Sequence, residues 1–93
     1  MAAEALERRL RIVNTKGLHA RASAKFVQCT AKFDASVTVL KDGHSVAGTS
    51  IMGLMMLGAG PGSEVTVRAS GNQAREALDA LENLVATKFG EDN

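Results

Sequence analysis

A histidine and two cationic side chains lie close together in the sequence, at Lys16, His19 and Arg21. The stretch that holds them joins an alternating, strand-like segment to a helix-like one. The first backbone N–H groups of a helix have no partners within it, and the helix dipole adds partial positive charge there, so this junction favours an anion. We therefore expect His19 to take up a phosphoryl group at a helix N-terminus and Arg21 to neutralise its charge.

The position of the histidine suits nucleophilic chemistry. The nucleophile must be an unprotonated imidazole nitrogen, and a helix N-terminus disfavours the imidazolium ion, so this position is expected to help keep the ring neutral near pH 7. Arg21 is predicted in the first turn of the helix, where the helix dipole disfavours a cation. Its charge becomes favourable once a dianionic phosphoryl group is bound beside it. Lys16 can add to the positive field. Against this interpretation, a single histidine in a small domain is more often an incidental surface or capping group.

Two separate blocks of the sequence resemble one known family. The run Gly-Leu-His-Ala-Arg at residues 17–21 is similar to the active-site signature of HPr, the phosphocarrier family of the bacterial phosphotransferase system. The run Ser-Ile-Met-Gly-Leu-Met-Met-Leu-Gly at residues 50–58 is similar to the regulatory-serine and docking-helix segment of the same family. Both blocks stand at the family's spacing, and the resemblance covers roughly residues 7–89.

The resemblance implies a histidine phosphocarrier rather than a free-standing enzyme. His19 would accept a phosphoryl group on Nδ1 from phosphorylated enzyme I and pass it to enzyme IIA-type acceptors, in sugar uptake or in its regulation. No metal, nucleotide or organic cofactor is implied, because the phosphoryl donor is another protein. One alternative within the family is the nitrogen-related regulatory branch. Another, of a different class, is a small ligand-sensing or interaction domain in which the histidine is incidental and His19→Ala is tolerated.

Ser50 has two compatible interpretations. Its simplest role is the N-cap of a short helix, which needs no modification. In relatives of the family, the matching serine is phosphorylated by a dedicated kinase, HPr kinase/phosphorylase. Such a modification would place negative charge beside the partner-binding surface and weaken docking.

The apolar run at residues 51–57 holds more hydrophobic side chains than one short helix can bury. Two leucines three residues apart can face the core, and Ile51, Met52 and Met55 then lie on another face. We expect these three side chains, with Lys16, to form an adaptable docking surface for successive partners. The alternative is that all the apolar residues of this run are core or partly covered.

One position departs from the family's pattern. Ala22 stands where a proline commonly follows the arginine. Proline in the first turn of a helix fixes φ and lacks an N–H that would be unpaired anyway, so alanine keeps the helix but loosens its start. The substitution bears on the geometry and lifetime of the phosphohistidine and leaves the nucleophile itself in place.

Composition sets the broad class of the protein. Ninety-three residues suffice for one small domain, spanning residues 1–93, with a modest core. A net charge of +1, with three phenylalanines and no other large aromatic side chain, argues against nucleic acid as a partner. Cys29 is the single cysteine, which excludes an internal disulfide and fits a reducing compartment.

The uncharged stretch at residues 43–63 raises the question of a membrane span. Its densely apolar part is far shorter than the roughly 20 residues that a spanning helix needs. The first nine residues carry charges where a signal peptide would need an apolar run. We therefore expect a cytoplasmic protein without membrane insertion, and a monomer by default.

The hydrophobic periodicity predicts the elements that position the histidine. Residues 9–13, 36–40 and 65–69 alternate between two faces, as strands with one buried face do. Asp42 and Gly43 suit a tight hairpin turn, with the return strand at residues 44–47. Helices are predicted over residues 20–31, over residues 51–56 with Gly58 at the end, and from Ser70 or Asn72 to Phe89.

These elements combine into an α+β fold. In the first helix, alanines and a valine at positions 20, 24, 27 and 31 recur at three or four residues, and Phe26 and Phe33 should help to seat it. The physical solution for this order is a four-stranded sheet with all three helices on one face and water on the other. The family resemblance implies the same open-faced sandwich, with an antiparallel sheet and the order βαββαβα.

Overall fold

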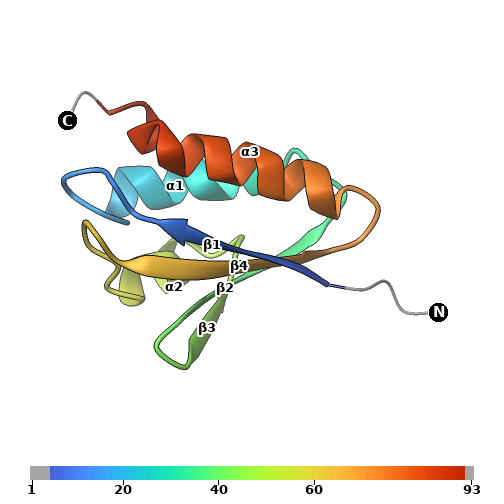
Figure 1. Cartoon of the computed structure of the whole chain (residues 1–93), viewed down its shortest axis with the longest axis horizontal. Helices are drawn as coiled ribbons and strands as arrows, with labels where there is room; N and C mark the ends of the chain where they lie inside the picture. The colour runs from blue at the N-terminus through green and yellow to red at the C-terminus, as the bar shows by residue number, and fades with distance from the viewer. Residues whose placement is uncertain (1–4, 92–93) are drawn as a thin grey trace.

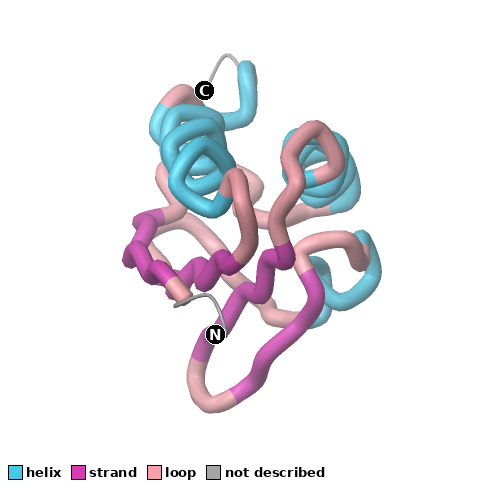
Figure 2. The backbone as a smooth tube through the Cα atoms, turned by 90° about the vertical axis from the view of Figure 1, so that its right-hand side faces the viewer, coloured by secondary structure: helices cyan, strands magenta, loops and turns pink. Residues whose placement is uncertain are grey.

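Four antiparallel strands form one sheet, and the helices pack together over one side of it (Figures 1 and 2). The computed structural model describes residues 5–91, and the strand order is β1-β4-β2-β3. The elements are β1 (Leu6–Arg11), α1 (Ala20–Thr30), β2 (Ser36–Lys41), β3 (His44–Ala47), α2 (Ile51–Met56), β4 (Glu64–Ser70), α3 (Ala74–Ala86) and a final 3₁₀ turn, η1 (Lys88–Gly90). The α+β open-faced sandwich expected from the sequence is confirmed.

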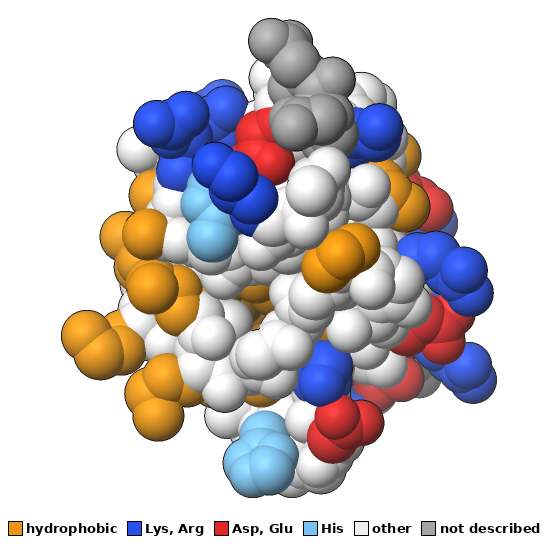
Figure 3. Space-filling view, turned by 90° about the vertical axis from the view of Figure 1, so that its left-hand side faces the viewer, with side chains coloured by type: hydrophobic (Ala, Val, Ile, Leu, Met, Phe, Trp, Pro, Cys, Tyr) orange, Lys and Arg blue, Asp and Glu red, His pale blue; other side chains and the backbone are white. Residues whose placement is uncertain are grey.

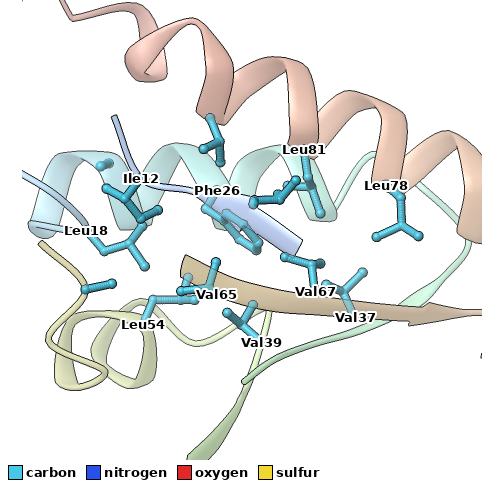
Figure 4. Close-up of a cluster of buried hydrophobic side chains, with 14 of the residues drawn as sticks. Ile12, Leu18, Phe26, Val37, Val39, Leu54, Val65, Val67, Leu78 and Leu81 are labelled. Carbon is cyan, nitrogen blue, oxygen red and sulfur yellow. The ribbon is translucent and has the colours of Figure 1, made fainter. Parts of the chain in front are cut away.

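The core lies between the sheet and helices α1 and α3 (Figure 4). Phe26 of α1 is 1% exposed, and it points toward β4, where Val65 and Val67 face the helices. Leu81 of α3 closes the same cluster from the other helix. Burying a side chain of this size stabilises the fold by about 1.5–3 kcal/mol. The core therefore fixes helix α1, whose first turn follows His19, against the centre of the sheet.

Helix α1 buries a different face from the one that its alanines indicated. Its buried residues are Ala22, Ser23, Phe26 and Thr30, whereas positions 20 and 31 are exposed and positions 24 and 27 are half-buried. Most of the predicted face is thus one residue, or about 100°, away from the observed one. The physical reason is that Phe26 has far more apolar surface to bury than any alanine. Its place toward the sheet sets the rotation of the helix.

Strand β1 begins and ends earlier than expected. It runs from Leu6 to Arg11, opposite residues 64–69 of β4. Ile12 is buried but has left the regular ladder, since its N–H donates to the Ser63 carbonyl and its own carbonyl accepts from Gly62. Val13 is 41% exposed. The expected alternation is right, but the strand stops where the chain turns toward the loop that contains His19.

The predicted hairpin and short helix are confirmed. Asp42 and Gly43 both have positive φ, at 51° and 82°, as a type I′ turn requires. The Ser50 hydroxyl accepts a hydrogen bond of 2.9 Å from the Gly53 N–H, which makes Ser50 the N-cap of α2. Gly58 ends that helix region with φ 67°. No described helix is long and apolar enough to cross a membrane.

The last helix is shorter than its hydrophobic pattern suggested. Position 73 is the N-cap, without a side-chain capping bond, so the expectation of Ser70 or Asn72 as the first residue was wrong. The Asn72 amide instead donates to the Asp34 carboxylate, 3.0 Å away. At the other end, α3 stops at Ala86, and Phe89 belongs to η1 with φ 56° while remaining 1% exposed. This turn redirects the chain toward the beginning of α1.

Candidate functional site

His19 is the N-cap residue of helix α1. Its backbone is extended, with φ −73° and ψ −178°, and its carbonyl accepts the first helical hydrogen bond from Ser23 at 2.9 Å. Its side chain makes no capping bond to the helix. His19, whose side chain is 27% exposed, thus directly precedes the first turn of α1, where the N–H groups have no partners within the helix. The sequence predicted this position correctly.

The loop before His19 is pinned to the segment that follows α2. The Leu18 N–H donates to the Ala59 carbonyl at 3.0 Å, and Gly17 takes a φ of 64°. Leu18 itself is 5% exposed and belongs to the core. These contacts hold the histidine at a fixed place at one end of the molecule.

Glu91 is the site residue that the sequence analysis missed. Its Oε2 lies 2.5 Å from His19 Nε2, although the two residues are 72 positions apart. Its Oε1 accepts a hydrogen bond of 3.0 Å from the Asn14 side-chain amide, which also donates to the Gly17 carbonyl at 2.8 Å. Asn14 is fully buried. No local pattern signals such a contact, because it depends on where the turn after α3 directs the chain.

The charge of Glu91 is fixed by its partners. Hydrogen bonds from His19 and Asn14 are the main reason that the pKa of Glu91 lies below its usual value, and the positive charge of Lys16 adds to the effect. Loss of hydration at the carboxyl acts in the opposite direction and raises the pKa, but the hydrogen bonds outweigh it. Glu91 is therefore an ionised hydrogen-bond acceptor at neutral pH.

Three cations surround the histidine and the glutamate. Lys16, Arg21 and Lys25 line a shallow surface depression together with His19 and Glu91. Figure 3 shows Lys and Arg side chains gathered beside a histidine on this end of the molecule, with hydrophobic side chains next to them. The cations and the helix N-terminus can together hold a dianion against the imidazole. The structure thus brings together His19, Arg21 and Lys16, as the sequence predicted.

An exposed apolar patch lies next to this depression. We call it the α2 patch, and it comprises Ile51, Met52, Met55 and Met56, which are 42%, 69%, 44% and 80% exposed. Leu54 and Leu57 are buried, as expected. Met55 shares a small surface hollow with His19 and Lys16. Met56 was not predicted as part of this surface, although it lies in the same apolar run.

The remaining chemically notable residues lie apart from this site or have structural partners. His44 is exposed at the start of β3, opposite Lys41 in the register of the hairpin. Cys29 is half-buried, and burial raises the pKa of its thiol. Within residues 5–91, no group of three His, Cys, Asp or Glu side chains is arranged to hold a metal ion.

Comparison with known proteins gives a consistent result. Residues 6–87 match the family described as "PTS HPr component phosphorylation site". The phosphocarrier protein HPr of Cupriavidus necator is 49% identical over 86 residues, which cover 92% of this chain and 97% of that protein. The phosphocarrier protein NPr of Shewanella violacea is 41% identical, over 92% of this chain and 94% of that protein.

Solved structures show the same architecture. A crystal structure of HPr from Thermoanaerobacter tengcongensis superposes with a TM-score of 0.90 and 43% sequence identity, covering 95% of this chain and 99% of that one. Sequence and backbone therefore agree over nearly the whole length of each relative.

Proposed function

Because this chain belongs to the HPr family of phosphocarrier proteins, we propose that His19 is the residue that carries its phosphoryl group. The protein is a phosphocarrier of the phosphotransferase system. The observation that supports His19 is its place as N-cap of α1, next to a depression lined by cations. His44, the other histidine, lies on the β2-β3 hairpin and shares none of these features.

We propose that Arg21 and Lys16 stabilise the transferred phosphoryl group. Both side chains are exposed and line the depression that holds His19. A charge-assisted hydrogen bond to a phosphate oxygen is about twice as strong as a neutral one. The group therefore arrives at a site whose positive charge is already in position.

Membership of the family implies partners of the phosphotransferase system, such as enzyme I and enzyme IIA proteins. We propose that these partners contact Ile51, Met52 and Met55, with Lys16 at the edge of the contact. The exposure of the α2 patch and its position beside His19 support this role. Methionine side chains are flexible and polarisable, so one patch can fit several partners in turn.

We further propose that Ser50 can act as a regulatory site for HPr kinase/phosphorylase. Its hydroxyl caps α2, and three residues of the α2 patch follow within five positions. A phosphate there would add about −1.5 to −2 charges next to an apolar contact surface. We expect it to weaken docking without removing the histidine's chemistry.

We propose sugar uptake or its regulation as the pathway, with the nitrogen-related branch as the second candidate. The second candidate is kept because an NPr protein is 41% identical to this chain. The transfer rate from the phosphorylated protein to sugar-specific and nitrogen-related IIA proteins separates the two. A rate at least tenfold higher toward one class assigns the pathway.

We propose that the chain acts as a single domain, as a monomer, in the cytoplasm. The free, half-buried thiol of Cys29 is compatible with a reducing compartment. Light scattering at micromolar concentration tests the oligomeric state, and a mass near twice 9.7 kDa would contradict the monomer.

The phosphocarrier site is tested by incubating the protein with phosphoenolpyruvate and a cognate enzyme I. We expect an acid-labile phosphate in the wild type, in Ser50→Ala and in the matched control His44→Ala, and none in His19→Ala. Label that persists in a folded His19→Ala variant would place the phosphoryl group elsewhere. An unlabelled wild type would contradict the assignment altogether.

A further inference from the structure

Three separate contacts hold Glu91 beside His19. Phe89 is buried in the core, and the carbonyl of Phe89 accepts a hydrogen bond of 2.6 Å from the Lys25 side chain on α1. The buried amide of Asn14 donates to Glu91 itself. The Glu91 side chain is only 14% exposed as a result. Its contact with His19 is therefore built into the fold at three points, two of them on the segments that flank the histidine.

This contact selects one form of the imidazole. An ionised carboxylate can only accept hydrogen bonds, so the proton in the His19–Glu91 bond belongs to Nε2. A neutral imidazole carries one proton on its two nitrogens, and the hydrogen bond at one nitrogen determines the state of the other. With Nε2 protonated, the available lone pair is on Nδ1. Among the described residues, the bond to Glu91 is the one side-chain hydrogen bond that His19 makes.

We propose that Glu91 is a positioning residue for phosphoryl transfer, which holds the proton on Nε2 of His19 and so presents Nδ1 as the nucleophile. The proposal rests on the assignment of His19 as the phosphorylated residue. The carboxylate then acts both when His19 accepts the phosphoryl group and when it donates it. Carboxylates and backbone carbonyls fix the tautomer and orientation of metal-binding and catalytic histidines in the same way.

Phosphoryl transfer to and from Nδ1 requires no proton to move on or off the ring. In the forward step the Nδ1 lone pair forms the N–P bond, while the bond from phosphorus to the donor atom breaks and its electron pair leaves with the donor. The ring keeps its Nε2 proton and becomes cationic, and Glu91 stabilises that charge through the existing hydrogen bond. In the return step the acceptor's lone pair attacks phosphorus, the P–Nδ1 bond breaks, and its electrons restore the neutral ring.

The cationic and anionic groups around His19 have different roles. Lys16 comes from the loop before α1, Arg21 and Lys25 come from the first turns of α1, and Glu91 follows η1. The three cations favour the phosphoryl oxygens, whereas Glu91 is the one acidic group among the described residues that line this depression. Because Glu91 holds the proton on Nε2, it keeps the phosphorylated ring cationic. A cationic phosphoimidazolium is a better phosphoryl donor than a phosphorylated ring that has lost this proton. We therefore expect Glu91 to speed both the loading and the discharge of His19.

The first test measures the tautomer of His19 in the unphosphorylated protein by ¹⁵N NMR of the ring. We expect the Nε2-protonated form to dominate in the wild type and in Glu76→Gln, an exposed control on α3. In Glu91→Gln, whose neutral side chain can also donate, we expect the Nδ1-protonated form to rise. An unchanged tautomer ratio in Glu91→Gln would overturn the proposal, whether or not the protein is ever phosphorylated.

The second test compares rates in protein labelled through enzyme I. We expect Glu91→Gln to slow both phosphorylation and discharge about three- to tenfold, Glu91→Asp to recover part of the loss, and Glu76→Gln to match the wild type. Faster phosphorylation of Glu91→Gln would show that the carboxylate competes with the phosphoryl group, which overturns the positioning role. An unlabelled wild type with the expected tautomer would instead contradict the assignment of His19, and the role of Glu91 in transfer would fall with it.

Discussion

Gly17 lies so close to Ala59 that a methyl group on its Cα would come within 2.3 Å of the Ala59 carbonyl oxygen. The obstacle is backbone, which cannot rotate away as a side chain can. The same carbonyl accepts the hydrogen bond from Leu18, next to the histidine. The approach of these two segments therefore needs a glycine for its space as well as for its positive φ.

Gly17→Ala should destabilise the protein by about 1.5–3.5 kcal/mol. A left-handed conformation costs an L-residue about 1–2 kcal/mol, and losing the Leu18–Ala59 hydrogen bond costs about 0.5–1.5 kcal/mol more. Gly43→Ala is the matched control, because Gly43 also has positive φ but nothing lies within 4 Å of the added methyl group. Urea unfolding should show the larger loss at Gly17, and equal losses would contradict the steric argument.

Two substitutions at Ser50 should separate its capping role from its regulatory one. Ser50→Ala removes the bond to the Gly53 N–H and should cost about 1 kcal/mol of unfolding free energy. Ser50→Asp keeps a good capping side chain but adds negative charge beside the α2 patch, so stability should be retained while the KM for enzyme I rises. Ser45→Asp, at an exposed serine of β3, is the control for the charge alone. A KM that rises equally in both aspartate variants would argue against a local effect.

Met55 and Met56 are adjacent methionines with different relations to the histidine. Met55 shares a hollow with His19, whereas Met56 is the more exposed side chain and does not line that hollow. We expect Met55→Ala to raise the KM for enzyme I about fivefold or more, as an interface residue worth about 1 kcal/mol does. Met56→Ala should have a smaller effect. Both variants should unfold within about 0.5 kcal/mol of the wild type, and the reverse order of KM values would move the contact surface away from His19.

The ionisation of Glu91 predicts a specific dependence of stability on pH. Its pKa is lower in the folded protein than in the unfolded chain, so the unfolded state binds protons more readily as the pH falls. The stabilisation from this group is therefore fully present at neutral pH, begins to fade near its usual pKa of 4.5, and is lost as the pH falls through the lower, folded-state value. The difference in unfolding free energy between wild type and Glu91→Gln should shrink over this acidic range. A difference that stays constant with pH would contradict it.

The parts of the site that could be predicted are the local ones. The strand, loop and helix around His19 follow from periodicity within about twenty residues, and the Ser50 cap follows from a serine before an apolar run. The Asp42–Gly43 turn was equally visible, because few residues tolerate its backbone angles. The docking role of the α2 patch and the roles of Arg21 and Lys16 stay predictions.

The parts that could not be predicted depend on tertiary packing. Alanine is compatible with either face of a helix, so the alanines of α1 could not reveal that Phe26 sets its rotation. The hydrophobic pattern of α3 extended to Phe89 because that side chain is buried. Phe89 lies, however, in a 3₁₀ turn after the helix and has a positive φ. That turn decides where Glu91 lies, and hydrophobic periodicity contains no information about it.

The separation of 72 residues between His19 and Glu91 also implies a delay between their synthesis on the ribosome. A ribosome adds about 5–20 residues per second, so about 4–14 seconds pass between the synthesis of the histidine and that of the glutamate. During this interval the nascent chain already contains His19, the cations and the sequence of α1. It gains the carboxylate only after all four strands and all three helices have been synthesised. The contact between Glu91 and His19 is therefore the last of the contacts described at this site to become possible during synthesis.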